Sequence, residues 1–323
     1  MEVRRLGELW PVSSLTLGGA GLGQLWGSTS RAEAVATMRE AVDAGVNLID
    51  VAPRYGDGEA ERVVGEAFGG RLPDGVRMST KYRVSNPPPS EVFERLERSL
   101  EESLERMRLS FVDLFFLHGS IVGSDEEGGE RRTPRGLYAE AVRPAFERLV
   151  EQGRIGAWGI TAIGVPRVLF EVLADESGPG AVQAIANPLD SAGELHWFEE
   201  DPRPREIIAE AERRAIGVMG IRAVAGGALT DRIDRDLPPD HLTAIDFRRA
   251  APMRQVAKEL GESTASLAHR YALSMDGVDT VVLGVKNREE LRECLAAESR
   301  GPLAADTIQE IDRRLSAAAG ASA

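Results

Sequence analysis

The feature that most constrains the fold is a repeated pair of segments, in which a short apolar run is followed by a longer run with apolar residues at helical spacing. The pair recurs about eight times without a break in composition. Strands that alternate with helices form a parallel sheet, and about eight units favour closure into a barrel over an open doubly wound sheet. We therefore predict an α/β fold, a (β/α)8 TIM barrel, with strands at Ser14–Leu17, Val46–Asp50, Val76–Thr80, Phe111–Leu117, Ile155–Ile160, Ala181–Ala186, Gly217–Ile221 and Thr280–Leu283.

Segments outside the repeat add to the barrel. Residues 3–12 alternate around Gly7-Glu8, which predicts a short N-terminal β-hairpin, and further helical patterns predict extra helices near the C-terminus. The polar, Gly-rich residues 119–136 predict a long loop. We expect one domain over residues 1–317 and a frayed tail over residues 318–323.

The net charge limits the classes of binding partner, and the cysteine content indicates the cellular compartment. The formal net charge of −13 argues against nucleic acid or an anionic membrane as the main partner. The single cysteine, Cys294, suits a reducing interior, and no apolar run approaches membrane-spanning length. We therefore expect a cytoplasmic protein, with monomer and homo-oligomer both left open.

Three charged or titratable residues follow predicted strands. Asp50 ends the second strand, Lys81 follows the third and His118 follows the fourth, while Pro53 and Gly56 bound a turn that presents Tyr55. In a (β/α)8 barrel the loops after the strands carry the chemistry, and a buried carboxylate needs a partner. The sequence predicts that these strand ends meet around Tyr55.

Simpler interpretations exist for each of these residues. Asp50 and Lys81 could form a purely structural ion pair at the rim, and His118 could be a strand-end histidine with satisfied hydrogen bonds. A metal site is not predicted, because no histidines are closely spaced and the cysteine is solitary. The histidine and cysteine residues considered as metal ligands are His118, His196, His241, His269 and Cys294.

Taken together, the motifs resemble those of the aldo-keto reductases. Asn47–Asp50 with Tyr55-Gly56, Ser79–Lys81 and Asp113–His118 occur in the family's order, and the likeness covers nearly the whole chain. The resemblance implies a nicotinamide-dependent reductase of aldehydes or ketones. Its catalytic tetrad would be Asp50, Tyr55, Lys81 and His118.

The chemistry of these four residue types suits that reaction. Hydride delivery to a carbonyl carbon leaves negative charge on the oxygen, so a proton donor is needed, and the pKa of a free tyrosine near ~10 is high for that task. A neighbouring ammonium at Lys81 would lower the pKa of Tyr55, and Asp50 would keep that ammonium charged. His118 would then orient the carbonyl by a hydrogen bond.

The resemblance also implies where a cofactor would bind. Thr161 and Gln183 would hold the nicotinamide carboxamide, although Ala162 lacks the amide common in relatives. The family habit favours NADP, but a carboxylate at Glu290 suits the bare ribose hydroxyl of NAD. The remaining candidate contacts, after the seventh and eighth strands, are Ile221, Arg222, Val224, Gly226, Gly284, Lys286 and Glu290, with Asp50 shared with the tetrad.

The sequence does not identify the substrate. Candidate pocket-wall residues on strand-end loops are Trp26, Arg54, Tyr82 and Trp197. Two alternatives to carbonyl reduction stay open. One is a sugar or alcohol dehydrogenase that works in the oxidative direction with NAD(P). The other is a cofactor-binding regulatory subunit with little turnover, since the family fold also resembles potassium-channel β-subunits.

Overall fold

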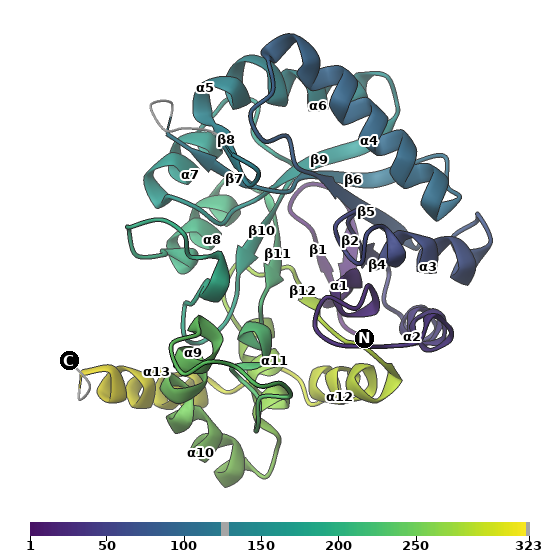
Figure 1. Cartoon of the computed structure of the whole chain (residues 1–323). Coiled ribbons are helices and arrows are strands. Elements are labelled where there is room, and N and C mark those ends of the chain that lie inside the picture. The colour runs from purple at the N-terminus through teal and green to yellow at the C-terminus, as the bar shows by residue number, and fades with distance from the viewer. Residues whose placement is uncertain (124–128, 321–323) are drawn as a thin grey trace.

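Eight parallel strands close into a barrel in the computed structural model, which describes residues 1–123 and 129–320 (Figure 1). The order around the barrel is β10-β11-β12-β3-β4-β5-β6-β9, so the first barrel strand pairs with the last. The predicted (β/α)8 barrel is therefore confirmed. The strands are β3 (Leu15–Gly18), β4 (Leu48–Asp50), β5 (Arg77–Tyr82), β6 (Val112–Leu117), β9 (Ile155–Thr161), β10 (Ala181–Ile185), β11 (Gly217–Ile221) and β12 (Thr280–Leu283).

The interior of the barrel is filled by side chains. Leu48, Leu114, Phe116 and Met219 form a fully buried cluster there. Phe116 lies opposite Gly159 on the neighbouring strand, and a Cβ at Gly159 would lie 2.3 Å from the Phe116 ring. A large ring therefore fits only because its neighbour has no side chain.

Helices surround the barrel in Figure 1 and bury their apolar faces against the strands. The first of them begins at an N-cap, where Ser30 Oγ accepts a hydrogen bond of 3.1 Å from Glu33 N. These helices are α2 (Arg31–Asp43), α3 (Glu59–Phe68), α4 (Val92–Met107), α6 (Arg143–Glu151), α7 (Pro166–Leu173), α8 (Pro204–Arg213), α11 (Thr264–Leu273) and α12 (Arg288–Ser299).

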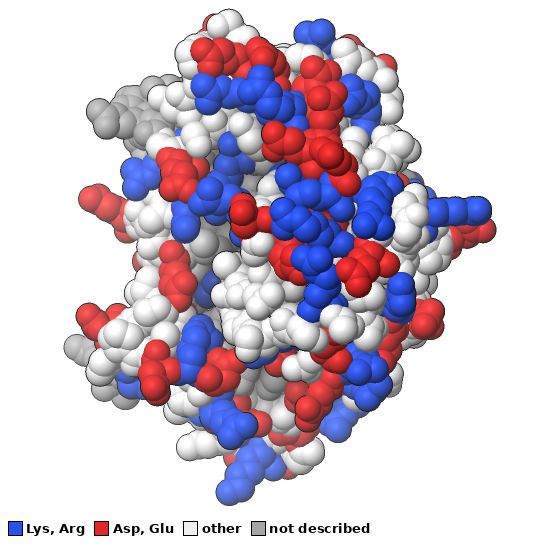
Figure 2. All heavy atoms as spheres, turned by 45° about the vertical axis from the view of Figure 1, so that its right-hand side comes forward, with Lys and Arg blue, Asp and Glu red and all other residues white. Residues whose placement is uncertain are grey.

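The surface is mixed in charge despite the net charge of −13. On the face shown in Figure 2, basic and acidic side chains interleave and do not separate into one-sign regions. Pairs one helical turn apart, such as Arg95–Glu91 at 2.6 Å, contribute to this pattern. No helix in the described parts of the chain is long and apolar enough to cross a membrane.

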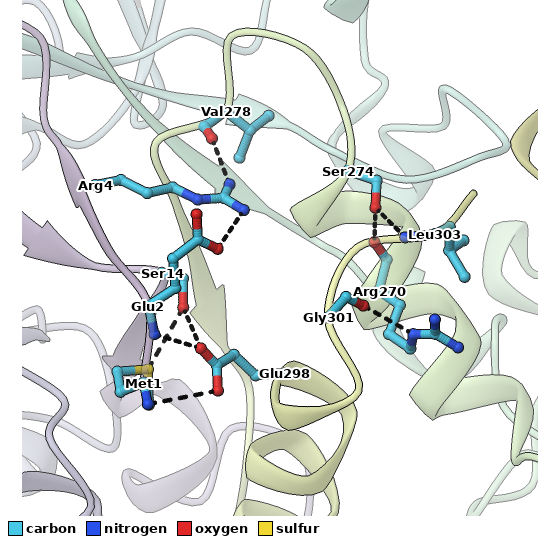
Figure 3. Close-up of polar contacts among 10 residues, drawn as sticks. All are labelled: Met1, Glu2, Arg4, Ser14, Arg270, Ser274, Val278, Glu298, Gly301 and Leu303. Atoms are coloured by element: carbon cyan, nitrogen blue, oxygen red, sulfur yellow. Dashed lines mark hydrogen bonds and ion pairs between the residues drawn. The ribbon is translucent and has the colours of Figure 1, made fainter. Parts of the chain in front are cut away.

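The predicted hairpin is confirmed and closes the N-terminal end of the barrel. Strands β1 (Val3–Arg5) and β2 (Pro11–Ser13) pair antiparallel, and Leu6 between them is fully buried with the interior cluster. The segment is held to α12 by Glu298, whose Oε1 accepts hydrogen bonds from Glu2 N at 2.6 Å and Ser14 Oγ at 3.0 Å (Figure 3).

Three further helices near the C-terminus form a second apolar cluster beside the barrel: α9 (Leu242–Arg249), α10 (Ala251–Leu260) and α13 (Ala305–Gly320). The last of them includes part of the tail predicted to fray, and residues 321–323 lie outside the described residues. The remaining short elements are α1 (Gly19–Leu22), η1 (Pro89–Glu91), α5 (Arg135–Leu137), η2 (Tyr138–Val142), η3 (Gly193–Leu195) and η4 (Ala225–Gly227).

The prediction of a loop over residues 119–136 is partly wrong. Strands β7 (Ser120–Val122) and β8 (Arg132–Pro134) pair parallel within it, and residues 124–128 of that prediction lie outside the described residues. A strand of three residues is too short to give a readable alternation, so periodicity alone does not reveal it.

Candidate active site

Asp50 and Lys81 form a buried ion pair at the C-terminal ends of adjacent strands. Asp50 Oδ2 lies 2.6 Å from Lys81 Nζ, which also donates to Val51 O at 2.9 Å. The other carboxylate oxygen accepts a 2.6 Å hydrogen bond from Ser79 Oγ. Burial is the largest single influence and would lower the pKa of the Lys81 ammonium, but the charges and hydrogen bonds of Asp50 and Tyr55 together outweigh it and the pKa is raised. Lys81 is therefore charged in the folded protein.

Tyr55 lies directly over this ammonium, with Lys81 Nζ 4.7 Å from the ring centroid. Burial raises the pKa of the Tyr55 phenol, and the positive charge of Lys81 offsets only part of that rise. From the sequence, we expected the Lys81 ammonium to have the larger effect on this pKa. Depth of burial, which a sequence does not report, reverses that balance.

His118 meets Tyr55 edge-on, with the ring centroids 5.8 Å apart and the planes at 83°. Its Nδ1 is buried and has no hydrogen-bond partner among the described residues. Burial, followed by the charges of Lys81 and Arg83, holds the pKa of His118 well below its usual value. The imidazole is therefore neutral near pH 7 and available for a hydrogen bond.

The turn that carries Tyr55 is positioned by close backbone contact with the Gly-rich loop after β3. Gly56 has φ +67°, and a Cβ there would lie 2.2 Å from Gly23 O. A Cβ at Gly23 would in turn lie 2.6 Å from Tyr55 O. These glycines thus allow two loops to pack backbone against backbone, and this contact fixes where the phenol lies.

A cavity of about 570 Å³ opens beside Lys81 and His118. Of the four residues predicted for the pocket wall, Arg54 and Tyr82 line it. Its other described lining residues are Pro53, Arg83, Ser85, Glu91, Glu94, Arg95, Arg98, Ser99, Glu102 and Glu130. Of the predicted tetrad, Lys81 and His118 line this opening.

The two predicted tryptophans lie elsewhere. Trp26 packs against Gly284, where an added Cβ would come within 2.6 Å of the indole ring. Trp197 donates from Nε1 to Ser120 Oγ at 3.2 Å and stacks with Arg132, whose Cζ is 4.4 Å from the ring centroid. Trp26 is thus next to the candidate cofactor residues, and Trp197 is next to β7.

Thr161 and Gln183 are brought together by strand register, since they are paired positions on β9 and β10. Thr161 Oγ1 and Gln183 Nε2 are both buried and have no hydrogen-bond partner among the described residues. Unpartnered buried polar atoms are costly, so a pair of them is typical of a site built for a polar ligand. A hydroxyl beside an amide can exchange hydrogen bonds with a carboxamide, so these residues fit a nicotinamide.

Arg222 follows Ile221 at the end of β11, and part of its guanidinium group also lacks hydrogen-bond partners among the described residues. Its Nε and Nη2 are buried without hydrogen bonds among the described residues, and a Cβ at Gly193 would lie 2.3 Å from Nη2. Burial lowers the pKa of this guanidinium, although Asp246 and Glu194 lie near enough to oppose the shift. The nearby loop that contains Val224 and Gly226 is held by Arg235, whose Nη2 donates to Gly226 O at 2.8 Å.

The start of α12 is already occupied by carboxylates. Glu290 Oε2 accepts a 2.8 Å hydrogen bond from Lys286 N, and Lys286 Nζ lies 2.6 Å from Asp234 and 3.3 Å from Glu290. Arg288 is paired with Glu33 at 2.9 Å. A phosphate at this helix start would have to displace these partners.

Arg83 was not singled out from the sequence, yet it lies beside the tetrad and its Nε donates to His118 O at 3.2 Å. A signal was available, because Ser79, Lys81 and Arg83 are spaced two apart along one strand and its extension and so lie on one face. No group of three metal-ligating side chains occurs in residues 1–123 and 129–320.

Comparisons with known proteins identify the family of the chain. Residues 14–315 match the model of the Aldo/keto reductase family. L-galactose dehydrogenase from Arabidopsis thaliana is 27% identical over 97% of this chain and 93% of its own length. A probable voltage-gated potassium channel subunit beta from the same plant is 23% identical over 84% of this chain and 83% of its own.

Solved structures match over the same extent. Aldo-keto reductase AKR11C1 from Bacillus halodurans, in its holo form, superposes with a TM-score of 0.76 at 25% identity, over 97% of this chain and 96% of its own. An aldo-keto reductase from Klebsiella pneumoniae, solved in complex with NADPH, superposes with a TM-score of 0.69 at 24% identity, over 97% of this chain and 94% of its own. The chain described here belongs to the aldo/keto reductase family.

Proposed function

We propose that this protein is an NAD(P)H-dependent oxidoreductase that reduces an aldehyde or ketone to an alcohol. The observation that carries the proposal is the buried Asp50–Lys81 pair beneath Tyr55, with His118 in edge contact with the same phenol. Each of these groups has a task in carbonyl reduction, and their convergence from separate strands is hard to explain as rim packing alone.

The four side chains would divide the work as follows. Tyr55 donates the proton that the carbonyl oxygen needs as it gains negative charge. The Lys81 ammonium stabilises the tyrosinate that is left, and Asp50 holds the ammonium in its charged form. The neutral His118 donates a hydrogen bond that orients the carbonyl oxygen toward the phenol.

Thr161 and Gln183 would hold the carboxamide of the nicotinamide, which, when bound, would supply the hydride. The buried Arg222 guanidinium, with two unpartnered nitrogen atoms, would bind an anionic part of the dinucleotide. We propose NADP(H) as the cofactor, in line with the Klebsiella pneumoniae relative. NAD(H) is the rival, because Glu290 and Asp234 already neutralise Lys286.

Calorimetric titration tests the cofactor assignment. Wild-type protein is titrated with NADPH, NADH and ADP-ribose, and the titrations are repeated with Gln183→Leu. Because ADP-ribose lacks the nicotinamide, we expect Gln183→Leu to weaken dinucleotide binding by about 10-fold and to leave ADP-ribose binding nearly unchanged. Equal loss for all three ligands would remove Gln183 from the nicotinamide site.

Two alternative functions each have a specific observation in their favour. The likeness to L-galactose dehydrogenase, together with Glu290, favours a dehydrogenase that oxidises a sugar or alcohol with NAD. The likeness to a potassium channel subunit beta favours a cofactor-binding subunit with little turnover. A screen of aldehydes, ketones, sugars and pyridoxal-type compounds with both nicotinamides, in both directions, separates the three. Tight cofactor binding without turnover of any compound would favour the subunit.

A further inference from the structure

Two arginines line the cavity beside His118, and the charge of a third acts on the same imidazole; we call Arg54, Arg83 and Arg131 the arginine cluster. Arg54 and Arg83 line the cavity together with Lys81 and His118. Arg83 comes closest to the tetrad, since its Nε donates to His118 O. All three guanidinium charges act on the His118 imidazole and help to lower its pKa, as does Lys81. The reacting end of the cavity is therefore strongly positive.

The cluster has more positive charge than its described neighbours neutralise by ion pairs. Glu130 pairs with Arg54 and lies 3.5 Å from Arg83 Nη1, but this carboxylate is 66% exposed to solvent. Arg83 Nη1 itself is buried and donates no hydrogen bond to any described residue. Arg131 has no ion pair with a described residue. Among the residues that the structure describes, Glu130 is thus the one carboxylate in an ion pair with this cluster.

The opposite wall of the cavity does not supply the missing negative charge. Its glutamates lie on and just before α4 and are paired along the helix, Glu91 with Arg95 at 2.6 Å and Glu94 with Arg98 at 2.5 Å. Glu102 lies 3.9 Å from Arg106. Arg106 also pairs with the buried Glu61 at 2.6 Å, and none of these helix glutamates lies within ion-pair distance of Arg83, whose one such partner among the described residues is Glu130.

We propose that the substrate is a carbonyl compound with an anionic group, a carboxylate or a phosphate, which Arg83 binds with Arg54 while the carbonyl lies at Tyr55. The anion would take the place that the exposed Glu130 carboxylate now fills, and it would give Arg83 Nη1 its missing acceptor. Arg83 is then a specificity-determining residue. This inference rests on the proposed function and narrows its substrate class.

Paired aldehydes that differ in charge test the proposal. The carboxylate pair is 4-formylbenzoate and its neutral methyl ester, and the phosphate pair is glyceraldehyde 3-phosphate and glyceraldehyde. We expect wild-type kcat/KM to favour the charged member of at least one pair by about 10-fold or more. In Arg83→Gln that preference should fall about 10-fold through KM, and Arg83→Lys should restore part of it because the charge returns. Arg213→Gln, an exposed arginine on α8, is the charge-matched control.

Other outcomes count against the proposal in a distinguishable way. Equal use of charged and neutral aldehydes by wild type and by Arg83→Gln would overturn the anion site and leave the reductase proposal standing. Loss of kcat for both members of a pair would show that Arg83 only supports His118, which also overturns it. Calorimetric binding of 4-formylbenzoate that depends on Arg83, without turnover, would support the anion site and count against carbonyl reduction.

Discussion

Asp50 Oδ2 lies 2.6 Å from Lys81 Nζ, and both side chains are almost completely shielded from solvent, with exposed fractions of 3% and 0%. A buried pair of this kind costs a large desolvation free energy that only the partner's charge offsets. In the proposed function this cost has a catalytic explanation, because the pair lies at the strand ends beneath the phenol of Tyr55.

Asp50→Asn should therefore destabilise the protein. Removing one charge of a buried pair leaves the other uncompensated, and the free energy of unfolding is expected to fall by about 3–5 kcal/mol. Because the pKa of Lys81 in the folded protein lies above 10.5, its contribution is present below about pH 10 and is lost only as the pH rises further. Urea denaturation at pH 7 measures the change. Asp74→Asn, in a pair 99% exposed at the aspartate, is the control and should cost less than about 1 kcal/mol. If Asp50→Asn also lowered the free energy of unfolding by less than about 1 kcal/mol, the buried pair would not be important for stability.

Tyr55→Phe should lower turnover and leave cofactor binding intact. The phenol is the proposed proton donor, and loss of a general acid slows a reaction by about 10²- to 10⁴-fold. Steady-state kinetics with any carbonyl compound found in the screen, combined with NADPH titration, measures both effects. Tyr82→Phe removes a phenol from the cavity that Lys81 and His118 line, and it should act on KM more than on kcat. A kcat unchanged in Tyr55→Phe would exclude this residue as the acid.

Glu290→Gln should shift cofactor preference toward NADP(H). The substitution keeps an acceptor for Lys286 N but removes the negative charge that faces the helix start and neutralises Lys286. We expect the Kd for NADPH to fall about 10-fold relative to that for NADH. Fluorescence titration with both nucleotides measures the ratio. Glu289→Gln removes the same charge from the exposed side of the same turn and serves as the control. A ratio that moves equally in both variants would reflect net charge alone.

The buried imidazole of His118 should make the protein less stable in mild acid. The pKa of His118 in the folded protein lies well below 6.5, so the unfolded chain binds a proton near pH 6.5 that the folded chain does not. The free energy of unfolding then falls as the pH drops below 6.5, by up to about 1.4 kcal/mol per pH unit. Denaturation at pH 7.5 and pH 5.0 should show a shallower fall in His118→Gln. An equally steep fall in that variant would show that other groups, among them the buried His269, carry the whole dependence.

The sequence predicted the barrel and the meeting of Asp50, Lys81 and His118 because strand ends follow from local alternation. In a parallel barrel every strand end lies on the same rim, so order along the chain already implies proximity. The pairing of Thr161 with Gln183 follows from the same rule once the strand order is known.

Loop positions did not follow from local pattern. The pair β7 and β8, the packing of Trp26 on Gly284 and the position of Trp197 on Ser120 depend on contacts between distant segments. The balance of forces on Tyr55 also depends on burial, which is a property of the assembled protein. Arg83 is different, because its spacing from Lys81 was visible and could have been used.

The pairing of β3 with β12 has a consequence for synthesis of the chain. All four tetrad residues are translated by position 118, yet the glycine loop that supports the Tyr55 turn is itself packed on the last strand's exit, where a Cβ at Gly21 would lie 2.3 Å from Val285 O. In a nascent polypeptide on the ribosome, the glycine loop that positions Tyr55 therefore has nothing to pack against until about residue 285 has emerged. The four tetrad side chains are therefore made early, but they are held in place only when β12 pairs with β3 and the barrel closes.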